Sequence, residues 1–280
     1  MSNRALRRIA FCKKHMANLG TYLLLTVAAI ACAGPFLWLL STSFKSNENV
    51  YALNFIPKNF SFESYVGVSK LVDIGQMMGN SVIITGGGVG LCVLMAALCA
   101  YPLAKMDFYG KKLVNAALVA TMVIPAAAGL VVNYITIQTL HLNGSFWGVI
   151  LPNSVNVFSI ILLRQAYLGV PKELLEAARI DGAGELRTWW RILLPQIVPS
   201  IVTVVIMDFI NKWNMFLWPL LILDVDQYPV APAMKHISNS FNYKFTNVAA
   251  GTVLSVLPVI VLFLIFQKEY VNNTVGGVKG

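Results

Sequence analysis

The chain has 280 residues, of which 57% are apolar and only 12% are charged. A soluble globular domain carries about 25% charged residues, so these charges are too few to cover a water-soluble globule of this length. Intrinsic disorder is also excluded, because it requires low hydrophobicity and high net charge. The net charge of +9 lies in short runs between apolar segments, whereas a nucleic-acid partner requires a basic face. The composition therefore predicts a membrane protein that binds no nucleic acid.

Apolar segments of about 20 residues, long enough for a transmembrane helix, recur along the chain. They run roughly over residues 20–41, 79–104, 113–135, 146–168, 197–222 and 247–267. Every segment contains at least one proline, which bends a helix, and membrane bundles tolerate the bend because neighbouring groups satisfy the freed backbone. The pattern predicts an all-α membrane protein with six transmembrane helices. The prolines are explained either by packing geometry or by kinked helices around a pathway.

The first segment also has features of a secretory signal peptide. It follows a basic start, and Ala31-Cys32-Ala33 supplies small residues for cleavage. However, the apolar run continues through residues 36–40, which is longer than the apolar region of a signal peptide. We therefore expect a retained transmembrane helix.

The distribution of basic residues predicts the orientation in the membrane. Of the 21 Lys and Arg residues, 15 lie in the N-terminus, the second and fourth connections and the C-terminal tail. Five lie on the opposite side. Because short cytoplasmic loops carry an excess of Lys and Arg, both termini are expected in the cytoplasm.

The chain divides by composition into two parts. Residues 42–78 contain Pro57, several aromatic residues and balanced charge, which indicates an ordered external segment. We therefore assign residues 1–78 to the cytoplasmic N-terminus, the first transmembrane helix and this external segment. Residues 79–280 are predicted to form a core domain of five transmembrane helices with a charged cytoplasmic connector at 164–196.

No enzymatic or metal-binding motif is visible in the sequence. The four cysteines include no C-x-x-C pair and the three histidines no H-E-x-x-H arrangement. The run Gly86-Gly87-Gly88-Val89-Gly90 is similar to a phosphate loop but lacks the following Gly-Lys-Ser/Thr. Within an apolar helix, small residues instead favour close helix packing. We expect no catalytic residue, no metal site and no enzyme activity.

The charged connector is predicted to form a helix-turn-helix along the membrane face. Pro171 suits the first turn of a helix, and Glu173 and Glu176 suit its positive N-terminal end. Gly182 and Gly184 then end the helix and permit a change of direction. The small surface of Ala177 and Ala178 would let another protein approach closely. A simple interfacial link between two transmembrane helices is the alternative.

The spacing of this connector resembles the EAA loop of ATP-binding-cassette (ABC) importer permeases. That motif has Glu-Ala-Ala, a glycine six residues after the glutamate, and Ile-x-Leu-Pro after nine more residues. The matching positions here are Glu176, Ala177, Ala178, Asp181, Gly182, Ala183, Ile192, Leu194 and Pro195. The resemblance implies a type I ABC importer permease fold. It also implies that the connector docks into a cleft on a separate ATPase subunit and transmits its closure to the transmembrane helices.

Other stretches resemble the carbohydrate-importer permeases of the maltose-transporter type. The run from Trp213 to Pro219 is similar to their Trp-Asn-x-Phe-Leu-Trp-Pro sequence, and residues 55–65 and 276–280 are similar to the shorter, second permease. The resemblance covers essentially the whole chain. It implies a heterodimer with a second permease subunit, an ATPase dimer that binds ATP and Mg, and an extracytoplasmic sugar-binding protein. It further implies a bacterial plasma (inner) membrane location and no cofactor in this chain.

Polar residues within the predicted transmembrane helices are candidates for a solute pathway. Ionisable residues in a membrane normally face the bundle interior or a water-filled cavity. Asp208 and Lys212 lie one helical turn apart, so they form either a structural ion pair or part of a transport site. Amides and Trp rings suit the hydroxyls and flat faces of sugars, although interhelical hydrogen bonding is the alternative for each amide. The candidates are Asn133, Asn153, Asn156, Asp208, Asn211, Trp213 and Asn214.

The sequence thus predicts the permease subunit of an ATP-driven ABC importer, which moves a sugar delivered by an external binding protein. The alternative is an ion-coupled secondary transporter or channel that works without an ATPase and uses Asp208 as a proton or cation site. The chain shows no inverted halves that would support this alternative.

Overall fold

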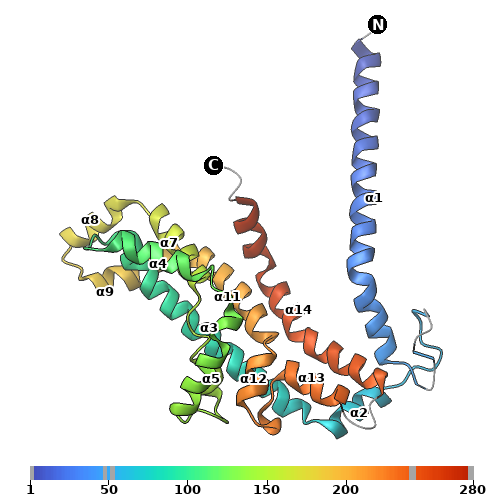
Figure 1. The fold of residues 1–280 in the computed structure, drawn as a ribbon. Coiled ribbons are helices and arrows are strands. Elements are labelled where there is room, and N and C mark those ends of the chain that lie inside the picture. The colour runs from blue at the N-terminus through green and yellow to red at the C-terminus, as the bar shows by residue number, and fades with distance from the viewer. Residues whose placement is uncertain (1–2, 47–48, 51–53, 240–243, 277–280) are drawn as a thin grey trace. The chain divides into compact units, whose positions relative to one another are not determined.

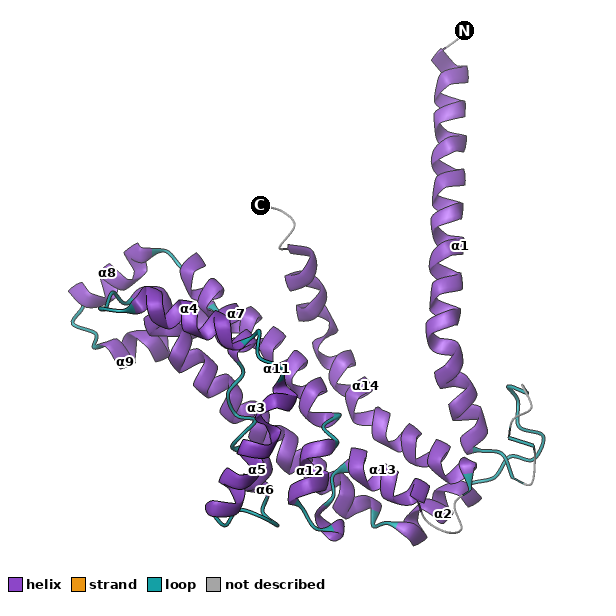
Figure 2. Cartoon of the chain, in the orientation of Figure 1, coloured by secondary structure: helices purple, strands orange, loops and turns teal. Residues whose placement is uncertain are grey.

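The structure is a computed structural model that describes residues 3–46, 49–50, 54–239 and 244–276. Within these ranges every regular element is a helix, and the only strand-like pairing is an isolated antiparallel bridge between Lys45 and Phe60 (Figure 2). The prediction of an all-α protein is therefore confirmed. Most of the C-terminal run at 276–280, which carried part of the resemblance, lies outside the described residues.

The chain forms two compact units, coloured by residue number in Figure 1. The first comprises Met1–Leu71 and Ser238–Leu254, and the second comprises Val72–Ile237 and Ser255–Gly280. These units group residues by contact, whereas the predicted division after residue 78 groups them by role. That division stays a prediction.

The first unit contains α1 (Asn3–Ser43), α2 (Glu63–Leu71) and the start of α14 (Phe245–Gly276). The segment between α1 and α2 carries a cluster of packed aromatic rings, in which Phe44 and Phe60 stack with centroids 4.7 Å apart. Glu63 at the start of α2 forms an exposed ion pair with Lys244 at 3.4 Å. Where it is described, the segment has specific contacts, as expected for an ordered excursion.

The second unit is built around α3 (Ile74–Lys105). Asp73 begins this helix by accepting a hydrogen bond from the backbone N–H of Gln76 at 3.0 Å. The helix packs against α7 (Val157–Gly169) and α11 (Val198–Trp213). The buried core between them consists of Ala96, Ala97, Ala100, Tyr101, Leu103, Ala104, Ile160, Leu163, Tyr167, Val170, Leu175, Trp189, Leu193, Ile197 and Val204. The alanines of α3 have small side chains, which allow the neighbouring helices to approach closely.

Three helices in the described part of the chain are long and apolar enough to cross a membrane. They are Gly20–Ser43, Ile74–Lys105 and Phe245–Gln267. A fourth is possible if Glu185–Gln196 and Val198–Trp213, bent by 77°, are taken together. The three long helices match the first, second and sixth predicted segments. The first continues to Ser43 as one helix, in line with a retained span.

The other three predicted segments are interrupted. The third is divided into α4 (Lys111–Thr121), a short 3₁₀ turn and α5 (Leu130–Thr139). The fourth is divided into α6 (Phe146–Ile150) and α7, and the fifth into α11 and α12 (Leu217–Ile222). Pro125 and Pro152 lie in the first two breaks, where a missing N–H prevents a continuous hydrogen-bond ladder.

Candidate coupling loop and polar cavity

The predicted EAA connector consists of short helices between α7 and α11. They are α8 (Lys172–Ile180), α9 (Glu185–Thr188), a π-helical turn (Trp189–Leu193) and α10 (Leu194–Gln196). Within the second unit, α8 and α9 lie at the end opposite α5 and α12 (Figure 1). The connector is therefore a helix-turn-helix, as the sequence predicted.

The turn between α8 and α9 depends on the backbone of Gly182. The N–H of Ala183 donates to the carbonyl of Ala178 at 2.9 Å, and the N–H of Gly182 donates to Arg179 at 3.1 Å. These two bonds form a Schellman motif, which requires a left-handed residue after the helix. Gly182 has φ of +72°, and a Cβ built there would meet no atom within 4 Å. The requirement for glycine is thus conformational and not steric.

The connector presents one face to the protein and another to the surroundings. Leu175 and Ala178 are buried against the core, whereas Glu176, Ala177, Asp181 and Gly182 are exposed and Ala183 is half-buried. Large apolar side chains are also exposed, including Ile180 at 86% and Leu186 at 71%. An exposed apolar surface of this kind is typical of a protein-binding site.

Hydrogen bonds attach the connector to two helices of the second unit, α3 and α7. The hydroxyl of Tyr101 on α3 donates to the carboxylate of Glu185 on α9, and Trp189 Nε1 donates to the Tyr167 hydroxyl on α7 at 2.8 Å. Arg179 on α8 also contacts Glu185, with 3.1 Å between Nη2 and Oε1. The Tyr101 bond lowers the pKa of the Glu185 carboxyl, partial burial opposes this shift, and Arg179 adds to it. Sequence reasoning missed the Tyr101–Glu185 and Tyr167–Trp189 bonds, because no local pattern of residues marks a contact between segments 84 or 22 positions apart.

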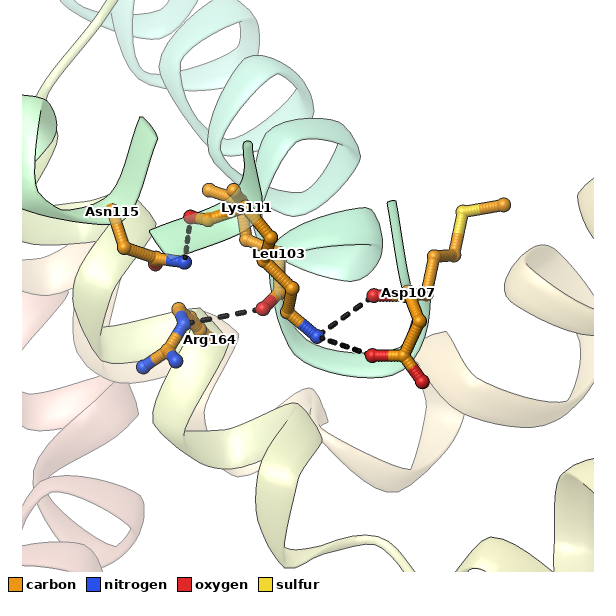
Figure 3. A network of polar contacts seen from close by, with 6 residues as sticks. Leu103, Asp107, Lys111, Asn115 and Arg164 are labelled. Atoms are coloured by element: carbon orange, nitrogen blue, oxygen red, sulfur yellow. Dashed lines mark hydrogen bonds and ion pairs between the residues drawn. The ribbon is translucent and has the colours of Figure 1, made fainter. Parts of the chain in front are cut away.

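The adjacent end of α3 is held by basic side chains (Figure 3). Arg164 Nε on α7 donates to the Leu103 carbonyl at 3.3 Å, and Lys111 Nζ donates to the Met106 carbonyl at 2.7 Å. Lys105 Nζ in turn donates to the carbonyl of Val170 at 2.6 Å. These bonds satisfy carbonyls that helix ends leave without intrahelical partners. Arg164 and Lys105, which were predicted to set the orientation of the chain in the membrane, therefore also connect α3 with α7.

A polar cavity of about 430 Å³ brings together four of the seven candidate pathway residues. Asn153, Asn156, Asp208 and Asn211 line it, together with Met122, Pro152, Val155, Val157, Phe158, Lys212 and Met215. Two of the amides also hold the local backbone. Asn153 Nδ2 donates to the Val149 carbonyl at 2.8 Å, and Asn156 Oδ1 accepts from the N–H of Phe158 at 3.0 Å. The break between α6 and α7 thus faces the cavity.

The two charged residues of the cavity form a buried ion pair. Lys212 Nζ lies 2.5 Å from Asp208 Oδ2, and their side chains are only 6% and 3% exposed. Gly88 on α3 makes room for this pair, because a Cβ there would lie 2.7 Å from Lys212 Cδ. The pairing lowers the cost of burying both charges. Part of the glycine-rich run therefore allows close packing, as predicted.

The other three candidates do not line this cavity. Trp213 is 4% exposed, stacks on Phe209 and donates to the Ser255 carbonyl at 3.0 Å. Asn214 Nδ2 donates to the Ile210 carbonyl at 2.9 Å, near the end of α11. Asn133 is exposed on α5. Trp213 therefore joins α11 to α14, whereas the bond of Asn214 stays within its own helix.

The described residues contain no group of three or more His, Cys, Asp or Glu that could hold a metal ion. The only charged side chains that line the polar cavity are Asp208 and Lys212, which bond to each other. The arrangement provides a partly polar space and an exposed connector.

Comparison with known proteins shows the family to which the chain belongs. Residues 88–271 match the family described as binding-protein-dependent transport system inner membrane component. The arabinooligosaccharides transport system permease protein AraQ of Bacillus subtilis is 30% identical over 253 residues, covering 88% of this chain and 90% of AraQ. The melibiose/raffinose/stachyose import permease protein MelC of the same species is 31% identical over 265 residues, covering 91% and 95%.

Solved structures share the fold. A chain in the crystal structure of a bacterial ABC transporter involved in the import of the acidic polysaccharide alginate has a TM-score of 0.81 at 24% identity. The match covers 91% of this chain and 97% of that chain. The prediction of an ABC importer permease fold is thus confirmed. The chain belongs to the family of binding-protein-dependent transport system inner membrane components, whose members are transport permeases of the inner membrane and not enzymes.

Proposed function

We propose that this chain is a transmembrane permease subunit of an ATP-driven importer for a sugar, either a monosaccharide or an oligosaccharide. The observation that carries the proposal is the exposed EAA connector in a chain of this family. The names of several relatives, among them AraQ and MelC, specify oligosaccharide transport. The sugar is delivered by an extracytoplasmic binding protein, as the family description suggests. Family membership disfavours the alternative of an ion-coupled transporter or channel.

The connector is proposed to transmit ATP-driven movement. The exposed Glu176, Ala177, Asp181 and Gly182 and the half-buried Ala183 would contact an ATPase dimer that binds ATP and Mg, so this chain needs no cofactor of its own. Ala178, buried on the other face, would support this surface. Short helices ended by a Schellman turn provide a compact surface for insertion into a cleft. Exposed Ile180 and Leu186 add apolar area to this surface.

The topology is proposed to comprise six spans with both termini in the cytoplasm. The three interrupted segments would each cross the membrane as broken helices, which bundles tolerate where the backbone is buried in protein or lines a cavity. A second permease subunit would complete a heterodimer. In the described part of α1, large apolar side chains from Tyr22 to Ile30 are more than half exposed, as expected for a helix that contacts lipid or such a partner.

The polar cavity is proposed to form part of the sugar pathway. Asn153, Asn156 and Asn211 offer amide groups that can both donate to and accept from hydroxyls, and Phe158 offers a ring. The Asp208–Lys212 pair leaves this cavity without net charge. Of the remaining candidates, Asn133 and Asn214 stay predicted pathway residues, while packing is the favoured role of Trp213.

The glycine turn tests the coupling role. Gly182→Val forces a β-branched residue into a left-handed conformation, so we expect at least a tenfold loss of ATP-driven uptake. Gly184→Val is the matched control, because Gly184 has φ of −67° and its Cβ would also meet no atom within 4 Å. Uptake is measured with raffinose and arabino-oligosaccharides in cells that produce the whole transporter. Normal uptake by correctly inserted Gly182→Val protein would contradict the coupling role.

Co-purification tests the assembly. We expect mild detergent to recover an ATPase, a second permease and a binding protein with this chain, as identified by mass spectrometry. Solute flux through liposomes that contain this chain alone, without ATP, would instead support the secondary transporter or channel.

A further inference from the structure

The connector is joined in space to a helix that it does not join in sequence. It follows α7 and precedes α11 along the chain, yet Glu185 accepts a hydrogen bond from Tyr101 on α3. These two residues are 84 positions apart. The attachment is partly buried, since Tyr101 is only 7% exposed. A movement of α9 must therefore either carry the end of α3 with it or break this bond.

The surrounding contacts strengthen the attachment. The rings of Tyr101 and Tyr167 meet edge to face with centroids 6.1 Å apart, and Tyr167 accepts the bond from Trp189. Arg179 on α8 holds the other oxygen of Glu185. Glu185 is thus the point at which both helices of the connector meet α3. Because one acceptor is ionised, its hydrogen bonds are among the stronger kind.

The middle of the same helix contacts Lys212, one of the residues that line the polar cavity. Gly88 lies 13 residues before Tyr101 on α3, which corresponds to about 20 Å along a helix. Lys212 of the cavity packs against the backbone of Gly88, where a Cβ would be 2.7 Å away. α3 is unbroken between the two positions. If the end of α3 that carries Tyr101 is displaced, the backbone at Gly88 therefore moves against Lys212 of the buried ion pair.

We propose that Tyr101 and Glu185 are positioning residues that transmit the movement of the connector through α3 to the polar cavity. This inference rests on the proposed function, and specifies the route by which closure of the ATPase reaches the solute pathway. The Tyr101 hydroxyl forms the bond to the connector, and Gly88, near the middle of α3, makes the contact with Lys212. The neighbouring helices α7 and α11 receive the movement through the chain itself, whereas α3 receives it through this hydrogen bond and through the core that it shares with Leu175, Trp189 and Leu193 of the connector.

The test measures movement at the cavity and does not depend on knowing the sugar. The transporter is assembled from all its subunits, with the four native cysteines of this chain replaced by alanine and Asn211→Cys introduced as a probe. The labelling rate with N-ethylmaleimide is measured with and without ATP and vanadate, beside the rate of ATP hydrolysis. In Tyr101→Phe we expect the ATP-induced change in labelling, relative to ATP hydrolysed, to fall about tenfold, which corresponds to about 1.4 kcal/mol.

Two controls separate this role from a general loss of stability. Tyr109→Phe removes a hydroxyl from a fully exposed residue near the same end and should leave the response unchanged. Glu185→Gln keeps an oxygen that can accept from Tyr101 and should retain the response, whereas Glu185→Leu should lose it. The double variant Tyr101→Phe/Glu185→Leu should lose no more than either single variant. If Tyr101→Phe fails to assemble, the two Glu185 variants decide the question.

The outcomes separate the two proposals. A full labelling response in Tyr101→Phe, or an equal loss in Glu185→Gln and Glu185→Leu, overturns the route through α3 and leaves the proposed function intact. No response to ATP in the transporter with unchanged Tyr101 and Glu185 overturns the coupling function, and this inference with it.

Discussion

Buried polar groups near the middle of α3 and at its C-terminal end have different roles. At the cavity, Asp208 and Lys212 are four residues apart on one helix and satisfy each other. At the connector, Tyr101 and Glu185 join segments 84 residues apart. The local pair keeps two buried charges compensated. The long-range bond instead holds two elements together. The comparison shows that buried polar groups compensate each other's charge at the first site and attach distant segments at the second.

The largest expected effect comes from breaking the local pair. Asp208→Ala leaves Lys212 buried and uncompensated, so we expect a loss of about 3–5 kcal/mol in stability, measured by thermal unfolding in detergent. The double variant Asp208→Ala/Lys212→Ala should lose less than Asp208→Ala, because no buried charge remains. Asp107→Ala is the matched control, since Asp107 is fully exposed in its i,i+4 pair with Lys111, and should cost at most about 1 kcal/mol. Equal losses at the two sites would contradict the comparison.

An intermediate effect is expected from the attachment of the connector to α7. Tyr167→Phe removes the acceptor of Trp189 Nε1, and both side chains are buried. The orphaned N–H should cost about 1–3 kcal/mol, observed as a lower unfolding temperature. Tyr109→Phe, at an exposed position, should stay within about 0.5 kcal/mol of the unchanged protein. If Tyr167→Phe is as stable as Tyr109→Phe, the bond between Trp189 and Tyr167 does not contribute to stability.

The smallest expected effects differ in sign within one glycine run. Gly88→Ala pushes a methyl group against the Lys212 side chain and should destabilise by about 1 kcal/mol or more. At Gly86 a Cβ would meet no atom within 4 Å, and Gly86→Ala should stabilise by up to about 1 kcal/mol through helix propensity. Both are measured by the same unfolding assay. Stabilisation by Gly88→Ala would mean that the ion pair has room to move away from α3.

Several features were predictable because they depend on neighbouring residues. Too few charged residues for a soluble surface predicted a membrane protein, and the glycine at 182 predicted the end of a helix that the structure places at Ile180. The i,i+4 spacing of Asp208 and Lys212 predicted that the two could pair. Helix periodicity and turn chemistry act over a few residues, so a sequence displays them directly.

The prolines show where such reasoning stops. Pro102 and Pro258 lie inside continuous helices, whereas Pro125 and Pro152 lie in breaks. Each residue carries the same local penalty, and only packing around it decides whether the helix bends or ends. The seven candidate pathway residues divide for the same reason. Four meet at one cavity, while Trp213 turns to the Ser255 carbonyl and contributes to packing.

The sequence by itself determined that the chain is a helical membrane protein, where its helix-turn-helix connector lies and which residue permits the connector to turn. Only the tertiary structure decided that α3 contacts both the connector and the polar cavity. The reason is physical: the Tyr101–Glu185 bond and the Gly88–Lys212 contact join segments distant in the chain. Contacts of this kind depend on how the helices pack, and no local pattern of residues encodes them.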